Sequence, residues 1–119
     1  MIKRIVIVED ELIIQELYID YLESLGYEVV ATFESGEKAI QYFQQESADL
    51  ILMDIRLDGI LDGIETMVEI NKKSSIPVVY ISGNSEARNL ERARLTNMKA
   101  FLSKPLNFKL LSDTLKKIQ

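Results

Sequence analysis

The 119-residue sequence contains no cysteine and no histidine. Without cysteine the chain has no disulfide framework and no thiolate zinc site, and without histidine it lacks the base of serine–histidine and cysteine–histidine hydrolases. No apolar run approaches the ~20 residues of a membrane span. The short apolar run near the start is followed directly by acids, unlike a signal peptide. We therefore expect a cytoplasmic protein with no membrane insertion.

Positive charge is also scarce, with 14 Lys and Arg against 19 Asp and Glu, a formal net charge of −5. A nucleic-acid surface needs concentrated cations, so we expect no direct nucleic acid binding. We interpret the cluster of Arg88, Arg92 and Arg94 as a solvated helix face. A composition of 47% hydrophobic and 28% charged residues predicts a folded chain, and the length suits one domain, residues 1–119.

Short β-branched runs alternate with longer segments of helical periodicity. The predicted strands are residues 4–8, 28–32, 50–53, 78–81 and 100–103. The predicted helices are residues 11–25, 36–45, 63–73, 86–97 and 108–118. Strands that are apolar throughout fit a parallel sheet covered on both faces, with right-handed crossovers. The predicted fold is therefore α/β, built from five successive βα units.

The helices carry local signals for their ends and for their buried faces. Ser35 and Asn107 are candidate N-caps, and Gly26 ends the first helix. Apolar residues at helical spacing predict which sides face the core. In the first helix these are Ile14, Leu17, Tyr18, Tyr21, Leu22 and Leu25, and in the last they are Phe108, Leu111, Leu115 and Ile118.

Polar residues follow four of the predicted strands. In an open α/β sheet, ligands bind beyond the carboxyl ends of the strands, so these residues are the candidate site. They are Glu9, Asp10 and Glu11 after the first strand, Asp54 after the third, Ser82 and Gly83 after the fourth, and Ser103, Lys104 and Pro105 after the fifth.

Four motifs stand at these strand ends in order: IVIVEDE, LILMDIRLDGILDGIE, VVYISGNS and AFLSKPLN. With them the whole chain resembles a receiver domain of the two-component response regulators, the CheY-like superfamily. The resemblance implies a flavodoxin-like sheet of five parallel strands in the order 2-1-3-4-5. It also implies a phosphoprotein of phosphorelay signal transduction, whose partner is a histidine kinase or a histidine phosphotransfer protein.

The resemblance assigns a role to each site residue. Asp54 is the implied phosphoacceptor, and a carboxylate that attacks a phosphoryl group needs cations nearby because the phosphoryl oxygens are negative. Lys104 and Ser82 would contact phosphoryl oxygens, and Gly83 would leave the phosphoryl group room. Phe101, three residues before Lys104, holds the place of the family's switch aromatic.

Acidic residues also predict a metal site. Glu9, Asp10 and Asp54 together form a hard oxygen site suited to Mg²⁺. By the resemblance, Asp10 binds the ion directly and Glu9 acts mainly through water. The backbone carbonyl of Arg56 is the third implied protein ligand.

The resemblance further implies a switch that phosphorylation shifts, in which the Ser82 hydroxyl and the Phe101 ring move. The surface of the fourth helix, fifth strand and fifth helix would then be read by a partner or output domain. Whether this surface also forms a homodimer is left open. Leu12 and Ile13 lie off the main apolar stripe of the first helix, and are either kinase-docking residues or additional core.

Several site residues allow structural interpretations when each is taken alone. Glu9 and Asp10 stand where acids cap a helix or complement its dipole. Ser82 can start a turn, and Phe101 fits a core position by periodicity. Lys104 before Pro105 can be an ordinary loop lysine, and the resemblance makes the bond between these two residues a cis candidate.

Residues Asp54 to Glu65 also match the spacing of an EF-hand calcium loop. Arg56 stands where that loop needs an oxygen ligand, and a strand-like run precedes it where a helix belongs, so we reject calcium binding. We interpret Asp58-Gly59 and Asp62-Gly63 as turns whose glycines adopt positive φ, with Asp62 a candidate cap of the third helix.

The loop after Asp54 departs from the family pattern, because it lacks the usual proline and is one residue longer. This departure puts partner docking in doubt.

Two rival functions remain. One is a Mg²⁺-dependent phosphatase with Asp54 as nucleophile, although Arg56 replaces the second acid of haloacid-dehalogenase-type enzymes. The other is a phosphate-independent interaction module. Our preferred interpretation is a signalling domain that catalyses its own phosphotransfer and slow dephosphorylation without being a dedicated enzyme.

Overall fold

The computed structural model describes residues 1–83 and 87–118, and within them five parallel strands form one sheet in the order β2-β1-β3-β4-β5. The α/β class and the strand order are therefore confirmed. Each strand ends within one residue of its predicted range, and β5 begins two residues earlier than predicted. The strands are β1 (Arg4–Val8), β2 (Glu28–Phe33), β3 (Leu50–Asp54), β4 (Val78–Ser82) and β5 (Met98–Ser103).

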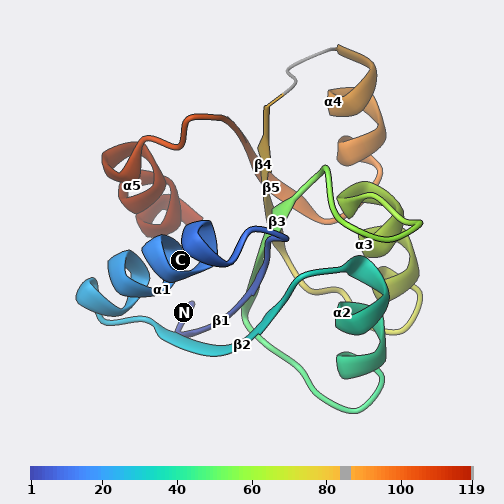
Figure 1. Cartoon of the computed structure of the whole chain (residues 1–119), viewed down its shortest axis with the longest axis horizontal. Helices are drawn as coiled ribbons and strands as arrows, with labels where there is room; N and C mark the ends of the chain where they lie inside the picture. Colours follow the sequence, from blue (N-terminus) through green and yellow to red (C-terminus); the bar gives the residue numbers. More distant parts are fainter. Residues whose placement is uncertain (84–86, 119) are drawn as a thin grey trace.

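Helices cover both faces of the sheet: α1 and α5 lie on one side, and α2, α3 and α4 lie on the other (Figure 1). They are α1 (Leu12–Ser24), α2 (Gly36–Tyr42), α3 (Gly63–Asn71), α4 (Ala87–Arg94) and α5 (Phe108–Ile118). Three of them end two or three residues before the predicted ends, because loose turns follow α2, α3 and α4. The predicted start of the fourth helix, Glu86, lies outside the described residues. None of the helices in the described ranges is long and apolar enough to cross a bilayer.

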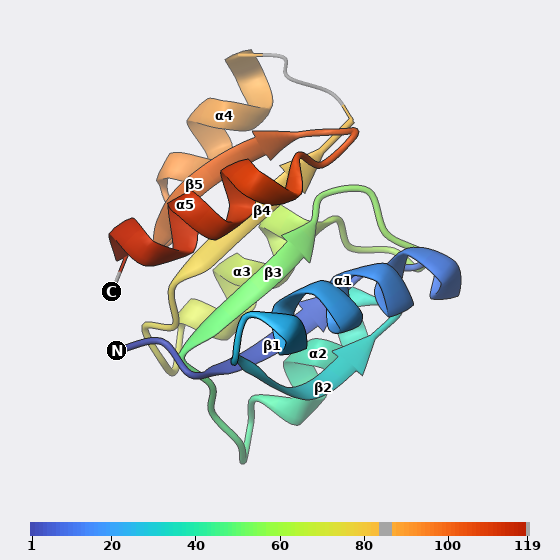
Figure 2. The same cartoon turned by 90° about the vertical axis from the view of Figure 1, so that its left-hand side faces the viewer.

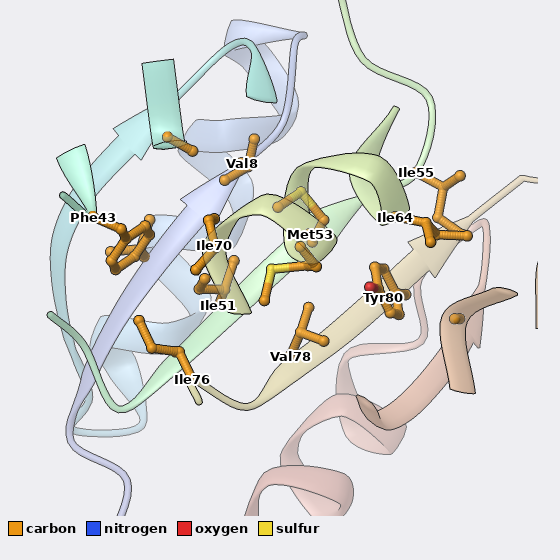
Figure 3. Close-up of a cluster of buried hydrophobic side chains, with 14 residues drawn as sticks. Val8, Phe43, Ile51, Met53, Ile55, Ile64, Ile70, Ile76, Val78 and Tyr80 are labelled. Carbon is orange, nitrogen blue, oxygen red and sulfur yellow. The ribbon is translucent and has the colours of Figure 1, made fainter. Parts of the chain in front are cut away.

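Successive strand residues point to opposite faces of the sheet, and each face has its own core. On the α2–α3–α4 face, Val8, Ile51, Met53, Val78 and Tyr80 are buried against side chains of these helices (Figure 3). The opposite core packs neighbouring strand residues against α1 and α5. Because the central strands are buried on both faces, they are apolar without alternation.

The predicted helix caps are confirmed. Ser35 Oγ accepts a hydrogen bond from the Lys38 N–H at 3.3 Å, and Asn107 Oδ1 accepts one from the Leu110 N–H at 2.9 Å. Gly26 has a φ of +95°, as expected for the residue that ends α1. These signals are local, since each cap bonds a residue three positions along the chain.

The buried face of α1 differs from the predicted one. Leu17 is 49% exposed, and the polar Gln15 is buried instead, with Nε2 donating to the Glu9 carbonyl at 2.6 Å. Leu25 caps the helix and is also exposed. Leu12 and Ile13 are 67% and 77% exposed, so their interpretation as additional core is wrong. The helix turns Gln15 inward because the carbonyls at the ends of β1 and β2 offer it hydrogen-bond acceptors.

Gly63 also differs from its prediction. Gly59 has the expected positive φ, +97°, but Gly63 does not, because it is the first residue of α3. A Cβ on Gly63 would collide with the Asp54 backbone carbonyl and lie 2.8 Å from Met53 Cγ. This glycine therefore permits close packing of α3 on the end of β3.

Candidate functional site

The candidate site lies where the carboxyl ends of β1, β3, β4 and β5 meet at one edge of the sheet. Asp54 is the last residue of β3 and is 3% exposed, and Ser82, the last residue of β4, is also buried. The Lys104 N–H donates to the Ser82 carbonyl at 2.9 Å, which fixes the start of the β5–α5 loop against β4. Next to these residues is a cavity of about 620 Å³, and Arg56 and Gly83 line it together with them.

Glu9, Asp10 and Asp54 bring their carboxylates together. One oxygen from each lies within 4.8 Å of the other two. Glu9 is fully buried: its Oε2 accepts from the Glu11 N–H at 2.8 Å, while its Oε1 has no hydrogen-bond partner among the described atoms. Burial, followed by the neighbouring acids, raises the pKa of Glu9 from 4.5 to about 8, although the Glu11 N–H opposes this.

Lys104 supplies the positive charge of the site. Its Nζ donates to Asp54 Oδ2 at 2.8 Å and lies 3.8 Å from Glu9 Oε1. Burial alone would lower the pKa of this ammonium group, but the hydrogen bond and charge of Asp54, with the charges of Glu9 and Asp10, raise it above its usual value. Lys104 therefore stays protonated. The other oxygen of Asp54, Oδ1, accepts from the Arg56 N–H at 3.3 Å.

The oxygen ligands that this site offers fit Mg²⁺. Three carboxylates converge, the Lys104 ammonium group forms ion pairs with two of them, and a buried oxygen of Glu9 lacks a hydrogen-bond donor among the described atoms. A buried carboxylate in this setting needs a second cation, and Mg²⁺ prefers hard oxygen ligands. Arg56, whose carbonyl is the predicted further ligand, lines the same cavity. The Glu9 carboxylate accepts from the N–H of Glu11, the N-cap residue of α1, but no side chain among the described residues caps this helix.

Two other predicted residues lie around this site. Gly83 is exposed, and among the described atoms a Cβ there would meet Lys104 Cδ alone, at 3.9 Å. Phe101 is half-buried and packs against Tyr80 of β4, with ring centroids 6.3 Å apart. Its ring belongs to the edge of the α2–α3–α4 core, so the core and switch interpretations of Phe101 are compatible. The bond between Lys104 and Pro105 is cis, as expected.

The loop between β3 and α3 uses its acids differently. Asp62 caps α3 in a reciprocal capping box: its Oδ1 accepts from the Glu65 N–H at 2.8 Å, and Glu65 Oε1 accepts from the Asp62 N–H at 2.9 Å. The cap was predicted, but the role of Glu65 was not. Asp58 is exposed and forms an isolated bridge with Ser35. Among the described residues, the group of acids that could hold a metal consists of Glu9, Asp10 and Asp54, and the rejection of the calcium loop stays a prediction.

Two tertiary contacts of this loop had no signal in the sequence. Glu37 Oε2 accepts from the Ile60 N–H at 2.9 Å, which joins the loop to α2 and lowers the pKa of Glu37. On the other side, Arg92 of α4 donates to Asp62 Oδ2 at 2.9 Å. Arg92 is only partly exposed, so the helix face predicted to be solvated also carries one tertiary ion pair.

The fold and these strand ends define a receiver domain of two-component systems. The family model described as the response regulator receiver domain matches residues 5–116, so the chain belongs to this family. Receiver domains are signalling domains and not classical enzymes, and Mg²⁺ binding and phosphorylation are typical of them.

The chain is similar to the polar-differentiation response regulator DivK of Brucella abortus, with 31% identity over 118 residues that cover 98% of this chain and 95% of DivK. It is also similar to the transcriptional regulatory protein PdtaR of Mycobacterium tuberculosis, with 32% identity over 117 residues. That match covers 98% of this chain but only 55% of PdtaR, so the chain spans about half of that relative.

Solved structures of receiver domains have the same fold as this chain. A CheY-like receiver domain protein from Methanospirillum hungatei superposes with a TM-score of 0.89 at 25% identity, covering 99% of this chain and 94% of that one. The receiver domain of the sensor histidine kinase PA1611 from Pseudomonas aeruginosa superposes with a TM-score of 0.84 at 28% identity, covering 98% and 97% of the two chains. The PA1611 structure holds a magnesium ion in its active site cleft.

Proposed function

We propose that this domain is a phosphorelay receiver in which Asp54 takes a phosphoryl group from the phosphohistidine of a histidine kinase or phosphotransfer protein. A carboxylate oxygen of Asp54 attacks phosphorus, and a new O–P bond forms. The P–N bond to the imidazole breaks, and its nitrogen keeps the electron pair. The observation that carries this proposal is the buried Asp54 carboxylate, held at 2.8 Å by Lys104 on the wall of an open cavity.

Lys104, Ser82 and Gly83 assist this transfer. The Lys104 ammonium, which stays protonated, stabilises the negative phosphoryl oxygens as the bond forms. The Ser82 hydroxyl, at the end of the neighbouring strand, donates a hydrogen bond to another phosphoryl oxygen. Gly83, which lines the cavity without a side chain, leaves the approach open to a phosphohistidine.

Glu9, Asp10 and Asp54 would hold a Mg²⁺ ion, with the Arg56 carbonyl as a further ligand. When bound, the ion supplies positive charge that offsets the phosphoryl oxygens. Supporting this assignment are the converging carboxylates and the Glu9 oxygen that has no hydrogen-bond donor among the described atoms. The protein's own part is to keep these acids fixed: Glu11 donates to Glu9, and Gln15 donates to the Glu9 carbonyl.

Phosphorylation would change the surface formed by α4, β5 and α5, which we call the α4–β5–α5 face. Ser82 and Phe101 lie on neighbouring strands, and Phe101 pairs in register with Tyr80. A movement of the Ser82 hydroxyl toward the phosphoryl group would allow the half-buried Phe101 ring to turn further inward. The partner kinase would dock at the start of α1, where Leu12 and Ile13 expose apolar surface.

The test is the intact mass of the protein after incubation with acetyl phosphate, in Mg²⁺ and in EDTA. We expect one Mg²⁺-dependent phosphoryl adduct in the wild type and in Asp58→Asn, and none in Asp54→Asn. The Asp58 variant is the matched control, because it removes an exposed aspartate of the following loop. Slow loss of the adduct after removal of acetyl phosphate would measure self-catalysed dephosphorylation.

An adduct that persists in Asp54→Asn would contradict the assignment of the acceptor. If acetyl phosphate gives no adduct, a phosphorylated histidine kinase domain replaces it as donor. Failure of that donor as well would leave the second candidate, a phosphate-independent interaction module with the same fold.

A further inference from the structure

Charge is divided unevenly between two parts of the chain. Residues 1–86 hold 6 Lys and Arg against 17 Asp and Glu, a formal charge of −11. Residues 87–118 hold 8 Lys and Arg against 2 Asp and Glu, a formal charge of +6. The second part supplies the α4–β5–α5 face, and because β5 is an edge strand, the two helices flank it at one end of the sheet (Figure 2). The acidic protein thus has one cationic face.

Most of the cations on this face are available to a partner. Arg92, Lys104 and Lys109 are engaged by acids of this chain. The remaining cations are exposed and form no ion pair within the described residues. They are Arg88, Arg94, Lys99, Lys116 and Lys117.

Two of these cations, Lys99 and Lys117, line surface that is hollowed and partly apolar. An open hollow of about 370 Å³ between β5 and α5 is lined by Lys99, Thr114, Lys117 and Ile118. Lys99 and Ile118 also line an adjoining hollow of about 400 Å³ below the sheet. Leu95, just after α4, is 87% exposed. Two lysines therefore converge on one hollow, next to apolar groups that a peptide side chain can cover.

We propose that the α4–β5–α5 face binds an acidic segment of a partner protein, with carboxylates at the hollow of Lys99 and Lys117 and apolar side chains beside them. This inference rests on the proposed function for the role of the face as the output surface, and adds the chemistry of the partner. Complementary charge favours such a segment, because it speeds encounter and rejects partners of like charge.

The same charges disfavour the two other occupants. A symmetric homodimer through this face would place two +6 surfaces against each other, since a two-fold interface pairs the same patch on both copies. A nucleic acid would extend beyond the face, along a molecule of only 33 × 32 × 27 Å whose residues 1–86 carry a formal charge of −11. Salt ions screen these charge interactions only in part across an interface, because the Debye length is about 8 Å at physiological salt.

The test is fluorescence anisotropy with a labelled peptide of ten glutamates, added to the unphosphorylated protein. The double variant Lys99→Glu/Lys117→Glu reverses the charge of the two lysines that line the hollow. Lys72→Glu/Lys73→Glu is the matched control, because it makes the same change in net charge at the end of α3. We expect the first variant to weaken binding about tenfold or more and the control about twofold or less, and binding to fall as salt rises.

Three results would overturn the proposal. In the first, both variants bind the peptide as the wild type does. In the second, a single-stranded decanucleotide binds more tightly than the peptide and loses affinity in Lys99→Glu/Lys117→Glu. In the third, sedimentation shows self-association that this variant abolishes. The phosphoryl adduct at Asp54 is measured on both variants, so that failure of the receiver chemistry is recognised separately from failure of this surface.

Discussion

Two acid-rich regions lie next to each other in this domain and use their carboxylates in opposite ways. At the strand ends, Glu9 and Asp54 are buried and converge with Asp10. In the loop that follows β3, Asp62 and Glu65 each accept a hydrogen bond from a backbone N–H. The first arrangement places acids together in a buried site, which disfavours their ionised forms unless a cation binds, whereas the second stabilises the start of a helix. Acidic residues therefore differ in role according to whether the fold buries them together or gives each a donor.

The pKa shifts express the same difference. Burial raises the pKa of Glu9 to about 8. At the edge of the loop, the Ile60 N–H lowers the pKa of the exposed Glu37. A carboxylate with a raised pKa opposes folding when ionised, and one with a lowered pKa supports it. The predictions below test this contrast, in order of decreasing effect.

The largest effect is expected from the charge of Glu9. In EDTA, wild-type stability should fall as the pH rises from about 5 to about 8.5, because Glu9 ionises near 4.5 when unfolded and only near 8 when folded. Glu9→Gln should remove this fall and exceed the wild type by on the order of a few kcal/mol above pH 8. Urea unfolding of both proteins at several pH values measures this difference in stability. An equally steep fall in the variant would contradict the role of Glu9.

The second prediction concerns Gly63, where the two regions touch. Gly63→Ala should lower the free energy of unfolding by about 2–3 kcal/mol, because the added methyl meets the Asp54 carbonyl. It should also weaken Mg²⁺ binding, since Asp54 must move. Gly26→Ala is the control: its methyl has open space, so only the positive φ costs stability, about 1 kcal/mol. Equal losses in the two variants would show that packing at Gly63 is unimportant.

The third prediction separates the acids by metal affinity. Asp10→Asn should weaken Mg²⁺ binding about tenfold, a loss of about 1.4 kcal/mol, because it removes one charged oxygen from the site. Asp58→Asn, in the neighbouring loop, should leave the affinity unchanged. Isothermal titration with MgCl₂ measures both. Similar affinity losses in the two variants would mean that the ion responds to overall charge and not to the strand-end site.

The smallest effect is expected from Asp62. Asp62→Ala removes the capping box and the contact with Arg92, and should cost about 1 kcal/mol of stability. Its Mg²⁺ affinity should remain that of the wild type. Asp62→Asn keeps a side-chain acceptor and should recover most of the loss, as thermal unfolding would show. If Asp62→Ala changed metal affinity and not stability, the contrast between the two regions would fail.

Features that depend on local pattern were predictable from the sequence. The apolar strands predicted the sheet, and Ser35, Asn107 and Asp62 were recognised as caps because each bonds a residue three positions along the chain. The convergence of Glu9 and Asp54 was also expected, since parallel strands bring their carboxyl ends to one edge.

Contacts between distant segments were not predictable where the strand ends do not bring the residues together. Periodicity placed Leu17 inward because it weighs apolar character alone, whereas Gln15 found backbone acceptors in the fold. The pairs Glu37–Ile60 and Arg92–Asp62 join residues 23 and 30 positions apart, and no spacing rule links them. Gly63 was misassigned for a similar reason: its neighbour is the carbonyl of Asp54, and only the packing of α3 on β3 reveals it.

The hydrogen bond between Lys104 and Asp54 spans 50 residues. The acids precede this lysine in the sequence, so a nascent chain carries the carboxylates before their ammonium partner is made. Because domains fold as units, the site becomes complete only when β5 has joined the sheet. A copy truncated before β5 would therefore keep the acids of the site and lack the lysine that carries its positive charge.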